Sequence, residues 1–246
     1  MDKALLVASS YGLGVLLNSA VHEFGHIFAY WSIGFTQFSL YIDPFASSNV
    51  TPLETLPPER MVFLASSGMA FQFIICLFSW WILRTRNNAL LVPLRFGAPM
   101  GILNIGSYLL ANSIVDGDSW LLVQHGVPEL VVNLGGLSIN LFGAYLFIRS
   151  LTVLGFDTSD SSWEIFTPLF LGVSAFAVIM TLYAQYAGFD VTYGIINMVT
   201  GLVLSVTSTV LFKKLRLDTG IERSRSDALT VFAAWVFLAS LTLVFF

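Results

Sequence analysis

"AVHEFGHIFAYW", residues 20–31, places two histidines, a glutamate and a glycine inside a run that is otherwise apolar. The run covers about residues 4–33, which is long enough to cross the roughly 30 Å hydrocarbon core of a bilayer. A carboxylate and two imidazoles are expensive to bury in hydrocarbon, and they are kept there mainly where they bind something. The stretch therefore predicts a membrane helix that carries a functional site.

The whole chain has the composition of an integral membrane protein. Of its 246 residues, 56% are hydrophobic and 11% are charged, and the mean hydropathy is +0.80. These values lie far outside the range of soluble domains. Long apolar stretches recur between short polar breaks, so the expected fold is an all-α polytopic membrane protein with about seven transmembrane helices. The predicted spans are about 4–33, 60–83, 96–115, 128–150, 164–187, 191–212 and 227–246.

The distribution of charge predicts the orientation and excludes some partners. With the N-terminus in the cytoplasm, ten of the eleven Lys and Arg residues fall on the cytoplasmic side, and Arg60 alone falls outside. A net charge of −4 with no basic face argues against a nucleic-acid partner. The single cysteine, Cys76, excludes an intramolecular disulfide and a thiolate metal cluster.

The longest segment between predicted spans, residues 34–59, contains an alternating pattern. Residues 37–43, "QFSLYID", alternate polar and apolar side chains, which is typical of a short strand with one wet face. An interfacial loop with coincidental alternation is the competing interpretation. A strand here would offer an edge against which an extended substrate segment could pair.

The histidine motif in the first span predicts a metal site. Positions four apart lie on one face of a helix, so His22 and His26 can converge on one ion. Glu23 lies near enough to act on a water held by that ion without being a ligand itself. The H-E-x-x-H arrangement is typical of zinc hydrolases, with two imidazole ligands and a glutamate general base. A hydrogen-bonded core cluster without metal is the alternative.

A catalytic zinc ion usually has three protein ligands, so a third ligand is expected. The outer end of the third predicted span carries "VDGDSW", residues 115–120, at the same predicted depth as the histidines. Asp116 is the preferred third ligand because it directly follows the apolar run and precedes Gly117, which lets the backbone turn close to a metal. Asp118 is the reserve candidate.

These motifs resemble those of the site-2 protease family of intramembrane zinc metalloproteases. The resemblance rests on "HEFGH" at residues 22–26, on the D-G pair at 116–117 and on "SSGMAFQ" at 66–72. In the last of these, Gly68 would be a close-approach glycine and Gln72 would occupy the position of a family Asn. The resemblance covers about residues 15–122. It implies a three-helix metalloprotease core over 1–122, and it leaves an additional C-terminal transmembrane bundle over 123–246 unmatched.

The sequence also departs from the family pattern. Met69 stands where the family has proline, Gln72 where it has Asn, and Val115 where it has Leu before the D-G pair. The family's site lies toward the cytosolic face, whereas the Lys and Arg distribution places this one toward the outside. Either the orientation is inverted in this chain or the orientation inferred from charge is wrong.

The resemblance implies an intramembrane zinc metalloprotease that hydrolyses peptide bonds of membrane-embedded protein or peptide substrates in the lipid bilayer. Zinc, Glu23 and the three ligands would carry the chemistry, and Asn18, Asn112, Gly68 and Gln72 are candidates for contacts around them. A buried Asn such as Asn18 is more commonly used for helix packing. A metal-ion transporter and a proteolytically inactive membrane scaffold are the competing functions.

Overall fold

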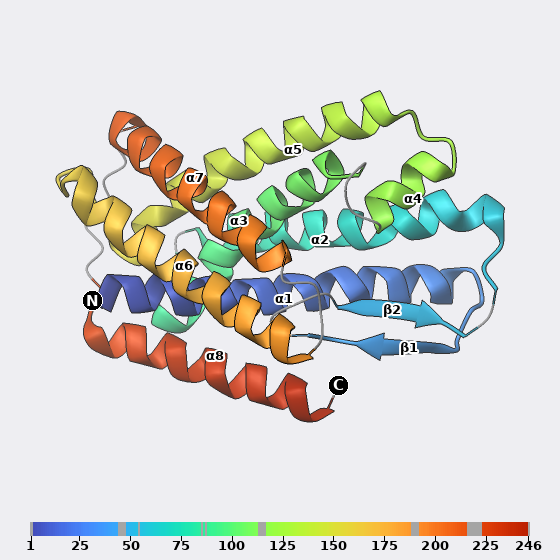
Figure 1. Ribbon diagram of the computed structural model, residues 1–246, viewed down its shortest axis with the longest axis horizontal. Coiled ribbons are helices and arrows are strands. Elements are labelled where there is room, and N and C mark those ends of the chain that lie inside the picture. Colours follow the sequence, from blue (N-terminus) through green and yellow to red (C-terminus); the bar gives the residue numbers. More distant parts are fainter. Residues whose placement is uncertain are drawn as a thin grey trace.

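A computed structural model describes residues 2–43, 48–53, 55–84, 86, 88–112, 117–187, 192–215 and 223–245. These residues form eight α-helices, three short 3-10 helices and a two-stranded antiparallel sheet (Figure 1). The helices are α1 (Asp2–Ser32), α2 (Met61–Leu83), α3 (Val92–Leu110), α4 (Asp118–Gln124), α5 (Glu129–Ser150), α6 (Ser162–Ala187), α7 (Thr192–Leu215) and α8 (Arg225–Phe245). The strands are β1 (Phe38–Tyr41) and β2 (Asn49–Pro52), and the 3-10 helices are Pro58–Arg60, Ala89–Leu91 and Leu151–Leu154.

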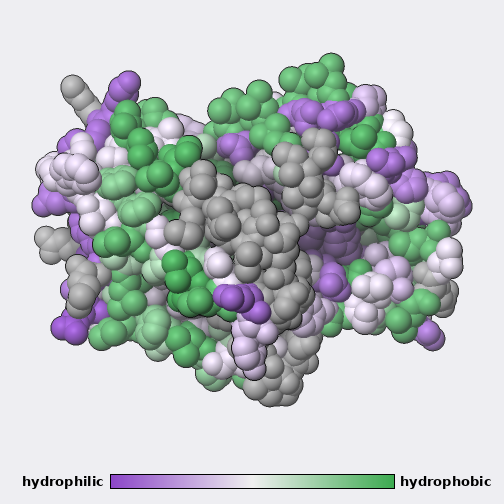
Figure 2. Space-filling model, viewed as in Figure 1, coloured by the Kyte–Doolittle hydropathy of each residue, from purple (hydrophilic) through white to green (hydrophobic). Residues whose placement is uncertain are grey.

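The mainly helical fold is confirmed, and each of the seven predicted spans corresponds to a long helix. Among the described residues, four helical segments are long and apolar enough to cross a membrane: Asp2–Ser32, Pro58–Leu83, Glu129–Leu154 and Ser162–Tyr183. The number seven therefore stays a prediction for α3, α7 and α8. Figure 2 shows hydrophilic residues gathered toward the left and right ends, with hydrophobic residues over much of the described surface between them.

Helix α1 lies at the centre of the molecule and contacts α2, α3, α6 and α8 (Figure 1). Its backbone approaches α3 closely because Gly14 and Gly97 face each other, so that a Cβ on either would meet the other's Cα. A large apolar core fills the N-terminal end of the bundle, where Leu6 and Val7 pack with Phe96 and Phe147. This core fixes the direction of α1 and hence the place of its C-terminal half.

Small residues also join α3 to α5. A Cβ on Gly106 would meet the backbone of Asn140, and one on Gly143 would meet the backbone of Leu103. The Asn140 side chain donates to the Leu103 carbonyl at 3.3 Å, as expected of a polar residue used for helix packing. Close packing of α5 on α3 holds the far end of α3, from which the chain continues toward α4.

The predicted strand is confirmed as β1, and it pairs with a second strand that the sequence pattern did not indicate. Phe38 pairs with Pro52, and Tyr41 pairs with Asn49. The hairpin lies beside the C-terminal half of α1 (Figure 1). Just beyond β1, the buried Asp43 carboxylate accepts hydrogen bonds from Tyr41 at 2.8 Å and from Tyr183 of α6 at 3.0 Å. The hairpin is therefore anchored to the C-terminal helices.

Candidate metal centre

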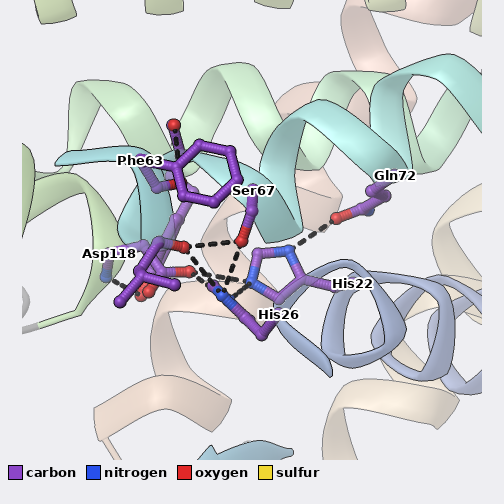
Figure 3. Close-up of polar contacts among 9 residues, drawn as sticks. His22, His26, Phe63, Ser67, Gln72 and Asp118 are labelled. Atoms are coloured by element: carbon purple, nitrogen blue, oxygen red, sulfur yellow. Dashed lines mark hydrogen bonds and ion pairs between the residues drawn. The ribbon is translucent and has the colours of Figure 1, made fainter. Parts of the chain in front are cut away.

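Three potential ligand atoms converge at the C-terminal half of α1 (Figure 3). The Nε2 atoms of His22 and His26 lie 3.2 Å apart, as one turn of helix allows. The carboxylate oxygen Oδ2 of Asp118 lies 2.9 Å from the first and 3.0 Å from the second. All three side chains are mostly buried. The histidine pair and an aspartate therefore form one compact group, as the sequence predicted.

The third member of the group is Asp118, the reserve candidate, at the first position of α4. Asp116, the preferred candidate, lies outside the described residues. The helix α4 itself was not predicted, because the third predicted span ends at residue 115 and no helix was expected before the fourth span at residue 128. Burial raises the pKa of the Asp118 carboxyl, but the contacts with the imidazoles of His22 and His26 outweigh it and hold the pKa at about 2. Asp118 therefore contributes a charged ligand.

Neighbouring groups fix the orientation of both imidazoles. Nδ1 of His22 lies 3.0 Å from Oε1 of Gln72, and Nδ1 of His26 lies 3.0 Å from the carbonyl oxygen of Leu64. A carbonyl oxygen can only accept, so Nδ1 of His26 carries the proton and its Nε2 faces the centre. Gln72 imposes the same tautomer on His22 while its own amide donates to the Gly101 carbonyl at 3.3 Å. Such contacts are typical of metal-ligating histidines.

The residues present fit a zinc ion. Two imidazole nitrogens and a carboxylate oxygen all accept hydrogen bonds and repel one another. They can lie about 3 Å apart only if positive charge, from a metal ion or from added protons, lies between them. Ligand atoms held about 2.0–2.1 Å from a tetrahedral zinc ion lie roughly 3.3 Å apart. The separations here are 2.9 to 3.2 Å, so small movements would place all three in a zinc coordination shell.

Glycines let the backbone come close to this group. A Cβ on Gly68 of α2 would overlap Nε2 of both His22 and His26, and a Cβ on Gly25 would meet the backbone of Ser67. Gly25 of α1 and Gly68 of α2 therefore lie on the two sides of the contact between these helices. A Cβ on Gly117 would overlap the Tyr108 hydroxyl, so a larger residue at this position of the D-G pair would displace the Tyr108 side chain.

Glu23 is 5% exposed and lies beside the ligand group. Its carboxylate is close enough to His22, His26 and Asp118 to interact with each electrostatically. The backbone of Val50 on β2 also faces it. The strand nearest to Glu23 is therefore β2, whereas the sequence had suggested residues 37–43 for the edge that faces the site.

Register explains why Val50 turns its backbone toward Glu23. The amide of Leu53 donates to the Gln37 carbonyl at 3.1 Å, so Gln37 and Leu53 form a hydrogen-bonded pair. In an antiparallel ladder such pairs alternate with pairs whose backbone groups point outward. Val50 is three residues from Leu53, so its amide and carbonyl point away from β1. They form the outer edge of the hairpin, where the Val50 backbone bonds the Glu23 carboxylate.

The other two candidate residues make contacts elsewhere. The Asn18 amide donates to the Gly97 carbonyl at 2.9 Å, and its oxygen accepts from the Cys76 thiol at 3.3 Å. Asn112 bonds Asn133 on α5 at 2.7 Å and the Leu109 carbonyl at 2.6 Å. These contacts stabilise helix packing around the centre.

The chain matches no protein-family model, no curated protein and no solved structure with which it was compared.

Proposed function

We propose that the protein is an intramembrane zinc metalloprotease of the site-2 protease type. The observation that carries the proposal is the position of Glu23, a buried carboxylate beside two imidazoles and an aspartate that together fit a zinc ion. A metal site used for structure or transport has no need of a further carboxylate next to its ligands. A hydrolase needs one as a general base.

His22, His26 and Asp118 would hold the metal. When bound, zinc would lower the pKa of a water molecule toward neutrality and polarise the peptide carbonyl. Glu23 would take a proton from the attacking water and later deliver it to the amine nitrogen of the leaving segment. Gln72 and the Leu64 carbonyl would keep both imidazoles in the tautomer that presents Nε2.

The hairpin supports a way of presenting the substrate. A helical substrate must unwind before its carbonyl groups become accessible, and pairing with a free strand edge would hold it extended. The outward backbone groups of β2 lie next to Glu23, so a segment paired there would pass the catalytic base. The substrate class that fits is a membrane-embedded protein or peptide segment.

We also propose a membrane topology, a division into domains and the identity of the metal. The chain would cross the bilayer seven times, with the N-terminus in the cytoplasm. Residues 1–122 would form the metalloprotease core, and residues 123–246 would support it. The bound metal would be zinc, because a set of two imidazoles and one carboxylate with an open position is typical of catalytic zinc sites.

Replacing Glu23 by Gln tests the proposal. The protein and its E23Q variant would be purified, assayed for metal by mass spectrometry, and reconstituted with a pool of synthetic single-span peptides whose cleavage products are identified. We expect one zinc per chain in both proteins and at least about a 100-fold loss of cleavage in the variant. Glu129→Gln is the matched control, because Glu129 is exposed at the start of α5.

Other outcomes would identify a different function. If zinc-loaded wild-type protein cleaves none of the peptides but carries zinc across liposome membranes at the same rate with and without Glu23→Gln, the protein is a transporter. Cleavage that survives the substitution would also contradict the assigned role of Glu23.

A further inference from the structure

Tyr30 lies on the same face of α1 as the metal motif. It follows His26 by four residues and Glu23 by seven, so its Cα stands one turn beyond the first and two turns beyond the second. Long side chains on a helix lean back toward its N-terminus and cover the preceding turn. The phenol of Tyr30 therefore extends back over the turn that carries His26.

The surroundings of Tyr30 are the groups that border the centre. The residue is 6% exposed and belongs to an apolar cluster with Leu64 of α2 and Val50 of β2. The Leu64 carbonyl holds His26, and the Val50 backbone faces Glu23. The ring of Phe38 stacks on that of Tyr30 with centroids 6.4 Å apart. Tyr30 thus contacts both the hairpin and the residues that border the metal centre.

The hydroxyl group lies near the reacting groups. The carboxylates of Glu23 and Asp118 both act on the phenol electrostatically. Among the described residues, no hydrogen bond of the Tyr30 hydroxyl is found, and its oxygen is not one of the fully buried polar atoms that lack a partner. A hydroxyl with some access and no partner in the described part of the chain can donate its proton to a group that binds in the site.

We infer that Tyr30 is a further catalytic residue, whose hydroxyl donates a hydrogen bond to the oxygen of the scissile carbonyl. The inference rests on the proposed function. As the water oxygen bonds to the carbonyl carbon, Glu23 takes a proton from the water and an electron pair of the C=O bond moves onto the oxygen. When the C–N bond breaks, that pair returns and Glu23 protonates the leaving nitrogen. Tyr30 keeps its proton throughout and stabilises the transient negative charge.

The substitution Tyr30→Phe tests the role with little structural disturbance. Because the hydroxyl makes no bond to the described protein, its removal should leave thermal stability and zinc content unchanged. We expect kcat on the single-span peptide pool to fall about 100-fold with little change in KM, since the hydrogen bond forms as charge develops. Tyr145→Phe is the matched control, because Tyr145 lies exposed on α5 and its loss should change neither quantity.

A second readout does not need turnover. A peptide phosphinate carries a tetrahedral, negatively charged centre that resembles the transition state, so it should bind the zinc-loaded wild-type protein. We expect Tyr30→Phe to weaken this binding by about 10- to 100-fold. The carboxylate product of cleavage is planar and lacks this geometry, so Tyr30→Phe should weaken its binding less.

The outcomes separate the two proposals. Equal cleavage and equal phosphinate affinity in wild-type protein and Tyr30→Phe would overturn the role of Tyr30 and leave the protease intact. A variant that loses zinc or stability would show a structural role and would overturn it as well. Zinc-loaded wild-type protein that neither cleaves peptides nor binds the phosphinate would overturn the protease, and the role of Tyr30 with it.

Discussion

Gly68 determines how closely α2 approaches the two imidazoles. A Cβ at this position would occupy the space of Nε2 in His26 and in His22, so that both imidazoles would have to move. Gln72, one turn further along α2, accepts the hydrogen bond of His22. A single helix face therefore provides both the space for the ligands and the contact that orients one of them.

Replacing Gly68 by Ala should weaken metal binding. The added methyl group would force the imidazoles to rotate away or α2 to shift, and either movement separates the three ligand atoms. We expect the affinity for zinc to fall at least about 10-fold, measured by competition with a chelator of known affinity. Gly135→Ala is the control, since a Cβ there would meet nothing within 4 Å. Wild-type zinc affinity in the Gly68 variant would contradict the close contact.

The sequence predicted those site residues that belong to a recognisable motif. His22, Glu23 and His26 share one motif, and Gly68 and Gln72 were recognised from a short resemblance. The contact of Leu64 was not predictable, because it uses a backbone carbonyl that every residue has. The choice between Asp116 and Asp118 as the third ligand also depended on where α3 ends and α4 begins. Short helices at the end of an apolar run leave little trace in composition.

At the scale of elements, the hairpin connects the metal centre to the C-terminal helices. The pattern at residues 37–43 predicted a strand, but it gave no information on the partner strand, because β2 is short and ends at a proline. The position of the hairpin depends on the hydrogen bond between Asp43 and Tyr183, which are 140 residues apart in sequence. Pairings over such distances follow from the packing of whole helices. The C-terminal helices thus stabilise the strand edge that faces Glu23.

Replacing Tyr183 by Phe should loosen the hairpin without affecting the metal ligands. The substitution removes one of the hydrogen bonds to the buried carboxylate of Asp43, a loss of about 2 kcal/mol. If the hairpin opens locally, backbone amides in β1 and β2 should exchange with deuterium roughly 30-fold faster. Hydrogen exchange with mass spectrometry measures this, with Tyr145→Phe as the control. Unchanged exchange would show that other contacts hold the hairpin.

At the scale of the molecule, a group of basic residues and the metal centre lie at opposite ends of α1. Lys3 of α1 pairs with Asp160 at 3.0 Å, Lys213 of α7 donates to the Thr158 carbonyl at 2.6 Å, and Arg223 donates to the Val153 carbonyl at 2.8 Å. These contacts gather basic residues from distant segments at the N-terminal end of α1. The metal centre lies toward the other end of α1, near α4 and the hairpin (Figure 1).

This separation makes the orientation testable. If basic residues mark the cytoplasmic side, the loop before α6 is cytoplasmic and the end of α4 faces outward. Single cysteines would be introduced in place of Ser159 and His125, which are both exposed, while the native Cys76 is buried. We expect a membrane-impermeant maleimide to label His125→Cys in intact spheroplasts of the expression host, and Ser159→Cys after permeabilisation. The reverse result would place the metal centre toward the cytosol, as the resemblance to site-2 proteases implies. It would also show that the basic end of this bundle faces outward, against the usual effect of positive charge on membrane insertion.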